Sequence, residues 1–436
     1  MIITSIKRFV LNLYSYFIAK SFDVRSRGFQ SLVLFCAWIG AMGFNFLVSL
    51  LTTRILGPAL FGDLRFIQTV WMLLTLLATF GFLQSGSRVL LLETNPTYAK
   101  QVVGVVLVLA LIMGILVGLV IALIAHPVDY FFHTHLASIM LSLAPLIIGI
   151  PLRDALLLIL QSTNQIILLA ALEFFPSLFY MVGLYIISKM TVINTVIILA
   201  IQQISLLGVV LVIIFVVQPR IGSFRHYLRK ILEVNRGFGF PIYTGLIATF
   251  ATSYLNRLSI SLWVNNTAIG FFSLASTIVE PLRLLPNAAA ISSFKSFSNQ
   301  EKISKKAFWF TLTLSFFTLV AAWLFIDPLL SWFYPKGFSS VGPMARILAL
   351  AALAQGLGDF YNRFLGAHGK GKNLRNVAYI VGIVNLMGII LITPFLGVNG
   401  VVITTVLAGL SNITFMFIVY KKYTVELGRS HLPRVS

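Results

Sequence analysis

Long apolar runs alternate with short polar segments along nearly the whole chain. Twelve runs of about 20 mostly apolar residues lie between residues 29 and 420. Each run is long enough to cross a hydrocarbon core about 30 Å thick, and a helix satisfies its own backbone polar groups inside lipid. The pattern therefore predicts an all-α integral membrane protein. We expect about twelve transmembrane helices, at residues 29–51, 66–87, 101–125, 137–160, 166–188, 192–217, 242–263, 267–292, 308–332, 343–366, 376–396 and 398–420.

The net charge of +20 is explained by where the basic residues lie. In a soluble protein this charge would suggest a nucleic-acid partner. Here 23 of the 32 Lys and Arg residues fall in the two tails and in the loops on one side of the predicted bundle. This distribution follows the positive-inside rule and predicts that both termini are cytoplasmic. The basic residues then face membrane lipids, and no nucleic acid is expected as a partner.

Three segments lie outside the apolar runs. Residues 1–27 combine apolar residues at helical spacing with several cations, which predicts an amphipathic helix on the cytoplasmic surface. Residues 218–241 form a basic cytoplasmic linker, and residues 421–436 form a cytoplasmic tail. Cys36 is the only cysteine, so no intrachain disulfide or cysteine-based metal site is expected. The histidines of the outer loops have no metal-ligand spacing, so we expect neither a metal nor a cofactor.

Short motifs recur between the two halves of the chain. Ser26-Arg27-Gly28-Phe29 before the first run is echoed by Asn235-Arg236-Gly237-Phe238 before the seventh, and Phe61-Gly62 is echoed by Ile269-Gly270. These matches predict two six-helix lobes, residues 28–217 and 242–420, related by a pseudo-two-fold axis around a central cleft. Chance similarity at helix starts is the alternative.

The motifs also carry a resemblance. The stretch Arg54-Ile-Leu-Gly57-Pro-Ala-Leu-Phe61-Gly62, with Gly81-Phe82-Leu83 and Arg88 further on, is similar to the first hairpin of lipid-linked oligosaccharide flippases. Asn256-Arg257 and Ile269-Gly270-Phe271-Phe272-Ser273-Leu274-Ala275 look like the corresponding hairpin of the second half. These flippases belong to the multidrug/oligosaccharidyl-lipid/polysaccharide exporter superfamily. The resemblance implies a multi-pass protein of the bacterial inner membrane. Many relatives have Asp where this chain has Asn256.

The first hairpin has a physical interpretation of its own. Gly57, Pro58 and Gly62 permit a tight reversal between two helices. Arg54, Asp63 and Arg65 are charges on the side that the positive-inside rule keeps poor in cations. The hairpin is interpreted as a turn stabilised by local ion pairs, and a rim contact for an exiting sugar is the alternative.

Charged residues inside the predicted helices are the main candidates for a functional site. Each costs about 2.5 to 3.5 kcal/mol at the centre of a membrane helix, so we expect it to face a cavity or a partner. Glu280 with Arg283, and Asp359 with Arg363, are spaced for pairing within one helix. Arg153 and Glu173 lie at similar depth on consecutive helices, which predicts an interhelical pair.

We hypothesise that Arg153, Arg257 and Arg283, with Asn256, line a central cleft and bind the diphosphate of a polyprenyl-linked sugar. A guanidinium suits this role because it keeps its charge and donates paired hydrogen bonds to phosphate oxygens. A structural network between helices is the alternative for the same arginines. Candidates for ion coupling are Glu173, Glu280 and Asp359.

The resemblance and the charges together predict a transporter and not an enzyme. The predicted function is to flip undecaprenyl-diphosphate-linked oligosaccharide repeat units from the cytoplasmic to the periplasmic leaflet by alternating access, for O-antigen or another surface polysaccharide. Polysaccharide polymerase and chain-length proteins are candidate partners. An ion-coupled multidrug exporter is the first alternative. A membrane polymerase or ligase, or a structural membrane partner, is a further alternative.

Overall fold

The computed structural model describes residues 27–297, 300 and 302–430, and every regular element in these residues is a helix. The amphipathic helix predicted for residues 1–27 lies outside the described residues, apart from Arg27. The first half comprises α2 (Arg27–Ala78), α3 (Phe82–Leu92), α4 (Pro96–Phe132), α5 (Ala137–Leu143), the 3-10 helix η1 (Ala144–Ile148), α6 (Gly149–Ser162), α7 (Ile166–Met190) and α8 (Thr195–Val217).

The second half follows a connecting segment. The connection contains α9 (Phe224–Val234) and the π-helical turn η2 (Asn235–Gly239). The remaining elements are α10 (Phe240–Leu246), the π-helical turn η3 (Ile247–Ala251), α11 (Thr252–Trp263), α12 (Asn266–Phe297), α13 (Lys305–Phe333), the 3-10 helix η4 (Lys336–Phe338), α14 (Val341–Ala367), α15 (Gly371–Leu391) and α16 (Thr393–Ser430).

Nine helices within the described residues are long and apolar enough to cross a membrane. One of them, α2, contains the first predicted span and most of the second. The seventh predicted span, 242–263, is divided among α10, η3 and α11, each of which is too short to cross a bilayer alone. The structure is thus that of a multi-pass membrane protein, and the count of twelve stays a prediction.

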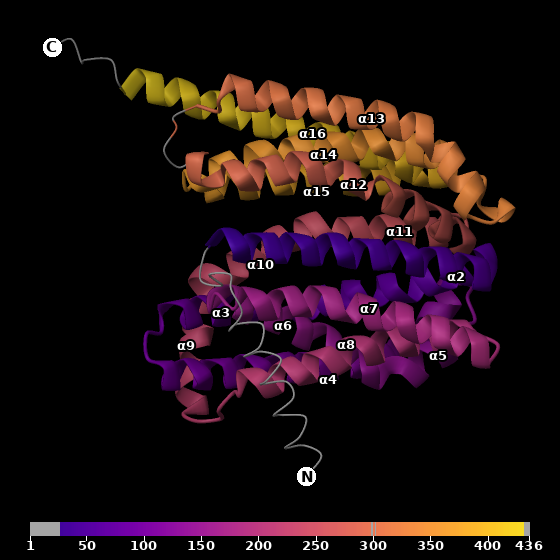
Figure 1. Cartoon of the computed structure of the whole chain (residues 1–436), viewed down its shortest axis with the longest axis horizontal. Coiled ribbons are helices and arrows are strands. Elements are labelled where there is room, and N and C mark those ends of the chain that lie inside the picture. The colour runs from indigo at the N-terminus through magenta and orange to yellow at the C-terminus, as the bar shows by residue number, and fades with distance from the viewer. Residues whose placement is uncertain (1–26, 298–299, 301, 431–436) are drawn as a thin grey trace.

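Gly57 divides α2 into two helices. Its φ of 68° and ψ of −179° are not helical, and Pro58 follows as the first residue of the next helix. A positive φ is open to glycine at little cost because glycine has no Cβ. The chain returns after Gly57, since α3 and α10 lie at the same end of the molecule as the start of α2 (Figure 1). Gly397, with φ 56°, breaks α16 in the same way.

The helices form two lobes. In Figure 1, α2 to α8 make one group and α12 to α16 make the other, with α10 and α11 between them. A buried apolar cluster joins the lobes, because it contains Phe61 and Leu64 of α2 together with Ile269 and Leu274 of α12. A second cluster fills the first lobe around α4 and α6, and an aromatic cluster closes one end of the second lobe around Phe360 and Phe364.

A joint between α3 and η2 holds the connecting segment against the first lobe. The backbones of Gly81 and Gly239 are in close contact. A Cβ on either glycine would overlap the backbone of the other. The Ser85 hydroxyl donates to Asn235 Oδ1 at 2.9 Å, and the Arg88 guanidinium lies 4.3 Å from the centre of the Phe238 ring. The motif residues around Gly81 and Arg88 therefore anchor the start of the second half.

Candidate functional site

The two lobes cross closely at a pair of glycines. A Cβ on Gly62 would overlap the carbonyl oxygen of Asn266, and a Cβ on Gly270 would lie 3.1 Å from the Gly62 Cα. These are the two glycines of the sequence repeat. The crossing of α2 and α12 therefore brings the two glycines of the predicted repeat face to face, with their backbones in close approach.

The hairpin at Gly57 contacts the second lobe beside this crossing. Arg54 Nη2 donates to the carbonyl oxygen of Phe333 at 3.0 Å, and the Phe61 and Phe338 rings lie 5.8 Å apart. Asp63 Oδ1 accepts a hydrogen bond of 2.7 Å from the Asn266 side chain. The expected ion pairs within the hairpin are not found among the contacts of the described residues. Instead, Arg54 and Asp63 bond to partners in the second half.

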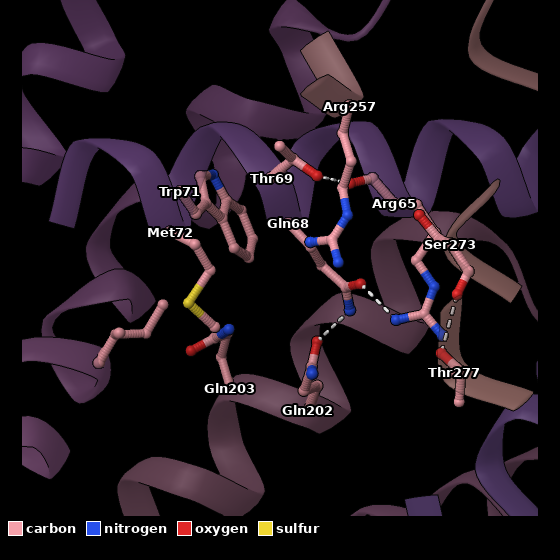
Figure 2. A pocket seen from close by; sticks show the side chains of 11 residues that line it. Arg65, Gln68, Thr69, Trp71, Met72, Gln202, Gln203, Arg257, Ser273 and Thr277 are labelled. Atoms are coloured by element: carbon pink, nitrogen blue, oxygen red, sulfur yellow. Dashed lines mark hydrogen bonds between the residues drawn. The ribbon is translucent and has the colours of Figure 1, made fainter. Parts of the chain in front are cut away.

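A pocket of about 200 Å³ lies next to the crossing, between the lobes (Figure 2). Its lining comes from α2, α6, α8, α11 and α12. None of its described lining residues carries a carboxylate. The lining residues are Arg65, Gln68, Thr69, Trp71, Met72, Ile150, Gln202, Gln203, Arg257, Ser273 and Thr277.

Two arginines from opposite lobes reach into this pocket. Figure 2 shows Arg65 of α2 and Arg257 of α11 with both guanidinium groups directed toward the space around Gln68. The Nε of each is buried without a hydrogen-bond partner, and neither forms an ion pair within the described residues. Two cations held close together without carboxylates make a strong site for an anion with several charged oxygens.

Amide side chains fix one of the two arginines. Arg65 Nη1 donates to Gln68 Oε1 at 3.1 Å, and Gln68 Nε2 donates to Gln202 Oε1 at 2.7 Å. The Arg65 guanidinium also lies 4.9 Å from the centre of the Phe61 ring, which is a cation–π distance. Arg65 is therefore held in place by neutral groups, which leaves its charge available to a ligand.

Of the arginines proposed from the sequence, the structure places only Arg257 in the pocket. Arg153 donates to both carboxylate oxygens of Glu173 at 3.0 and 3.1 Å and lies 3.3 Å from Asp154. The interhelical pair of Arg153 and Glu173 expected from their depth is thus present.

Arg283 pairs with a different acid from the one expected. Its Nη2 lies 2.8 Å from Asp359 Oδ2, which joins α12 to α14 instead of pairing within α12. Glu280, the partner expected within α12, is exposed. Arg283 thus forms its ion pair with a neighbouring helix and not with Glu280, because sequence spacing shows only neighbours on the same helix.

Asn256 faces away from the pocket. It is 4% exposed, and its Nδ2 donates to Asn385 Oδ1 of α15 at 3.1 Å. This contact places Asn256 inside the second lobe, although its neighbour Arg257 lines the pocket. The two residues point in different directions because consecutive helical residues are about 100° apart.

The sequence interpretation missed Arg65 and the glutamines. Arg65 was placed in an outer loop because the apolar run was taken to begin at residue 66, whereas the helix starts directly after Gly57. Residues 65, 68, 69 and 72 then share one helical face. The adjacent pair Gln202-Gln203 interrupts a long apolar run and was an available signal.

Comparison with known families agrees with the fold. The family model for polysaccharide biosynthesis proteins matches residues 30–288, which is more than half of the chain. The chain belongs to this family. No curated protein matches the chain closely enough to be reported.

Solved transporter structures have the same fold. An inward-facing multidrug transporter of the multidrug/oligosaccharidyl-lipid/polysaccharide exporter superfamily is similar with a TM-score of 0.71 and 13% identity, covering 92% of this chain and 99% of that one. The lipid II flippase MurJ, in an inward closed conformation, has a TM-score of 0.71 and 16% identity, with 92% and 90% covered. An outward-facing multidrug transporter has a TM-score of 0.60 and 13% identity, with 91% and 96% covered.

Proposed function

We propose that this protein is a flippase for polyprenyl-diphosphate-linked oligosaccharides. It moves repeat units linked to undecaprenyl diphosphate from the cytoplasmic to the periplasmic leaflet of the bacterial inner membrane, for O-antigen or another surface polysaccharide. The observation that carries the proposal is the pocket between the lobes, whose described lining carries no acid and whose Arg65 and Arg257 form no ion pair within the described residues. Membership in a polysaccharide biosynthesis family supports it.

The chemistry of the pocket suits this headgroup. A diphosphate offers several charged oxygens, and two guanidinium groups can hold them with paired, charge-assisted hydrogen bonds. The amides and hydroxyls of Gln203, Ser273 and Thr277 are groups that hydrogen-bond to sugars. The polyprenyl tail stays in lipid, because only the headgroup needs a polar path.

A binding site shared by both lobes supports alternating access. Arg65 belongs to the first lobe and Arg257 to the second, so one anion bridges them. The contacts at Gly62, Gly270 and Arg54 close one end of the interface. We propose that this is the periplasmic end and that the headgroup enters from the cytoplasm. Outward movement of one negative charge is then favoured by about 2.3 kcal/mol per 100 mV of membrane potential.

The pocket argues against the multidrug exporter and against an enzyme. A cationic drug needs a carboxylate, and the described lining carries two cations and no acid. The same described lining contains no Asp, Glu or His that could activate the hydroxyl of Ser273 or Thr277 as a nucleophile. Partners such as a polysaccharide polymerase remain part of the proposal.

The test is genetic and biochemical. Deletion of the gene should remove the surface glycan while its lipid-linked repeat unit accumulates on the inner leaflet. Arg65→Ala and Arg257→Ala should each reproduce the defect at normal protein level. Arg346→Ala is a matched control, because Arg346 pairs with Asp327 away from the pocket. Normal glycan in both pocket variants would reject the site.

A further inference from the structure

A line of two glutamines leads from Arg65 across the pocket to α8. Arg65 donates to Gln68 at 3.1 Å, and Gln68 donates to Gln202 at 2.7 Å. Figure 2 shows both bonds as one continuous connection from α2 to α8. Gln68 and Gln202 are separated by 134 residues, so this contact exists only in the folded protein.

The direction of each hydrogen bond follows from arginine. A guanidinium has donors and no acceptor, so Gln68 must turn its Oε1 toward Arg65. Its Nε2 then points to Gln202, which must present its own oxygen in return. The charge at one end thus sets the orientation of both amides, and hydrogen bonds in such a line strengthen one another.

The last amide of the line has a donor left over. Gln202 uses its Oε1 to accept from Gln68, and no hydrogen bond from its Nε2 occurs among the described contacts. Gln202 also lines the pocket. Arg65, Arg257 and Gln202 therefore all present unused N–H groups at one site, which favours a ligand rich in negatively charged oxygens.

We infer that Gln68 and Gln202 are positioning residues that orient Arg65 toward the diphosphate, and that Gln202 adds a further donor to the same anion site. This inference rests on the proposed function. Without Gln202, the Gln68 amide loses its bond to α8 and is held by Arg65 alone, so that it can turn away from the guanidinium. Arg65 would then lose its acceptor and its orientation.

A double-mutant cycle tests the line. Binding of inorganic pyrophosphate to the purified full-length protein is measured by calorimetry for the wild type, Gln68→Met, Gln202→Met and the double variant. Each single change should weaken binding about tenfold, because each removes an orienting hydrogen bond to or through a charged group. The double variant should bind about as weakly as the weaker single variant, because both changes break one connection.

Gln203→Met is the matched control. Gln203 lies next to Gln202 and lines the same pocket, but it has no part in the line. In the double variant of Gln203→Met with Gln68→Met, the two fold-losses of pyrophosphate affinity should multiply. Gln68→Met and Gln202→Met should also weaken the binding of pyrophosphate more than the binding of orthophosphate. Gln203→Met should leave the ratio of these two affinities unchanged.

The outcomes separate the inference from the proposed function. If the wild type does not bind pyrophosphate, both the diphosphate site and the line are wrong. If it binds, but the losses of Gln68→Met and Gln202→Met multiply, the line is wrong and the site stands. Melting temperatures show whether each variant is folded. If a methionine variant is not folded, Gln68→Asn or Gln202→Asn replaces it, because asparagine keeps the amide on a shorter side chain.

Discussion

At the scale of single residues, partners decide which charges can bind a ligand. Arg153 and Arg283 are as deep in the sequence-predicted helices as Arg257, but each is held by a carboxylate. Removing one member of such a pair leaves an uncompensated charge, so these arginines serve mainly to join helices. Arg65 is held by the neutral side chains of Gln68 and Phe61, and neither Arg65 nor Arg257 forms an ion pair within the described residues. Both guanidinium groups can therefore bind an anionic ligand.

The guanidinium of Arg65 is expected to be irreplaceable by an ammonium group. Lysine keeps the charge, but it offers a single point donor in place of a planar fork. We expect Arg65→Lys to reduce transport of the lipid-linked repeat unit by about tenfold or more, with binding of pyrophosphate weakened in parallel. Transport into vesicles and calorimetry measure the two effects. Full activity in Arg65→Lys would show that charge alone is sufficient at this position.

Of the three acids proposed for ion coupling, Glu280 is the remaining candidate. Glu173 and Asp359 are engaged with Arg153 and Arg283, whereas Glu280 is exposed and forms no ion pair among the described residues. Glu280→Gln should therefore remove the dependence of transport on a proton or sodium gradient, and Glu173→Gln should keep it. Vesicle assays with and without each gradient decide this. Unchanged dependence in both variants would exclude coupling through these carboxylates.

At the scale of elements, the hairpin within α2 determines where Arg65 lies. Gly57 ends the first helix with a left-handed φ, and Pro58 starts the second helix at once. Arg65 is then two turns into a helix and not in a loop. The same backbone break lets Arg54 reach the end of α13 in the other lobe. One glycine thus positions both a pocket residue and a contact between the lobes.

Substitution of this glycine is expected to destabilise the protein. In Gly57→Ala the alanine must adopt φ 68° and ψ −179°, a backbone conformation that is essentially restricted to glycine, which costs about 1 to 3 kcal/mol although no atom lies within 4 Å of the new Cβ. The melting temperature in detergent should fall accordingly. Gly43→Ala is the control, because Gly43 also has open space around it but lies in regular helix. Alanine there should leave stability unchanged or raise it. Equal melting temperatures for the two variants would contradict the argument.

At the scale of the whole molecule, the Gly62–Gly270 crossing controls how closely the lobes approach. A Cβ on Gly62 would overlap the backbone of Asn266, so a side chain at Gly62 forces α2 and α12 apart, and a Cβ on Gly270 would lie only 3.1 Å from the Gly62 backbone. The crossing lies between the hairpin contacts and the pocket, and therefore closes the pocket on one side. If the protein alternates between two access states, this closed end must form and open in each cycle.

A methyl group at this crossing is expected to block the cycle. Gly62→Ala should insert into the membrane normally but lose most transport, because the state with this end closed becomes unfavourable. Gly208→Ala is the control, since no atom lies within 4 Å of a Cβ built at Gly208. Transport assays and thiol labelling of a cysteine placed at Gln203 measure activity and access to the pocket. Wild-type transport by Gly62→Ala would show that close approach is not required.

The amino-acid sequence by itself determined the membrane class and the helical content of the chain. These properties depend on local composition and on periodicity, which the order of residues contains directly. Gly62 and Gly270, which meet at the crossing, already stood at matching positions of the predicted repeat. Of the family motifs, Arg257 lines the pocket, and Gly57 lies eight residues before Arg65 of the same pocket.

Only the tertiary structure decided which polar groups share the pocket. The sequence spacing matched Arg283 with Glu280 and Asp359 with Arg363, and it placed Arg65 in the first hairpin. Gln68 meets Gln202 across 134 residues, and Arg283 meets Asp359 across 76. Such contacts depend on helix rotation and on lobe packing. The hydrophobic pattern cannot fix either one, because membrane helices are apolar on most faces.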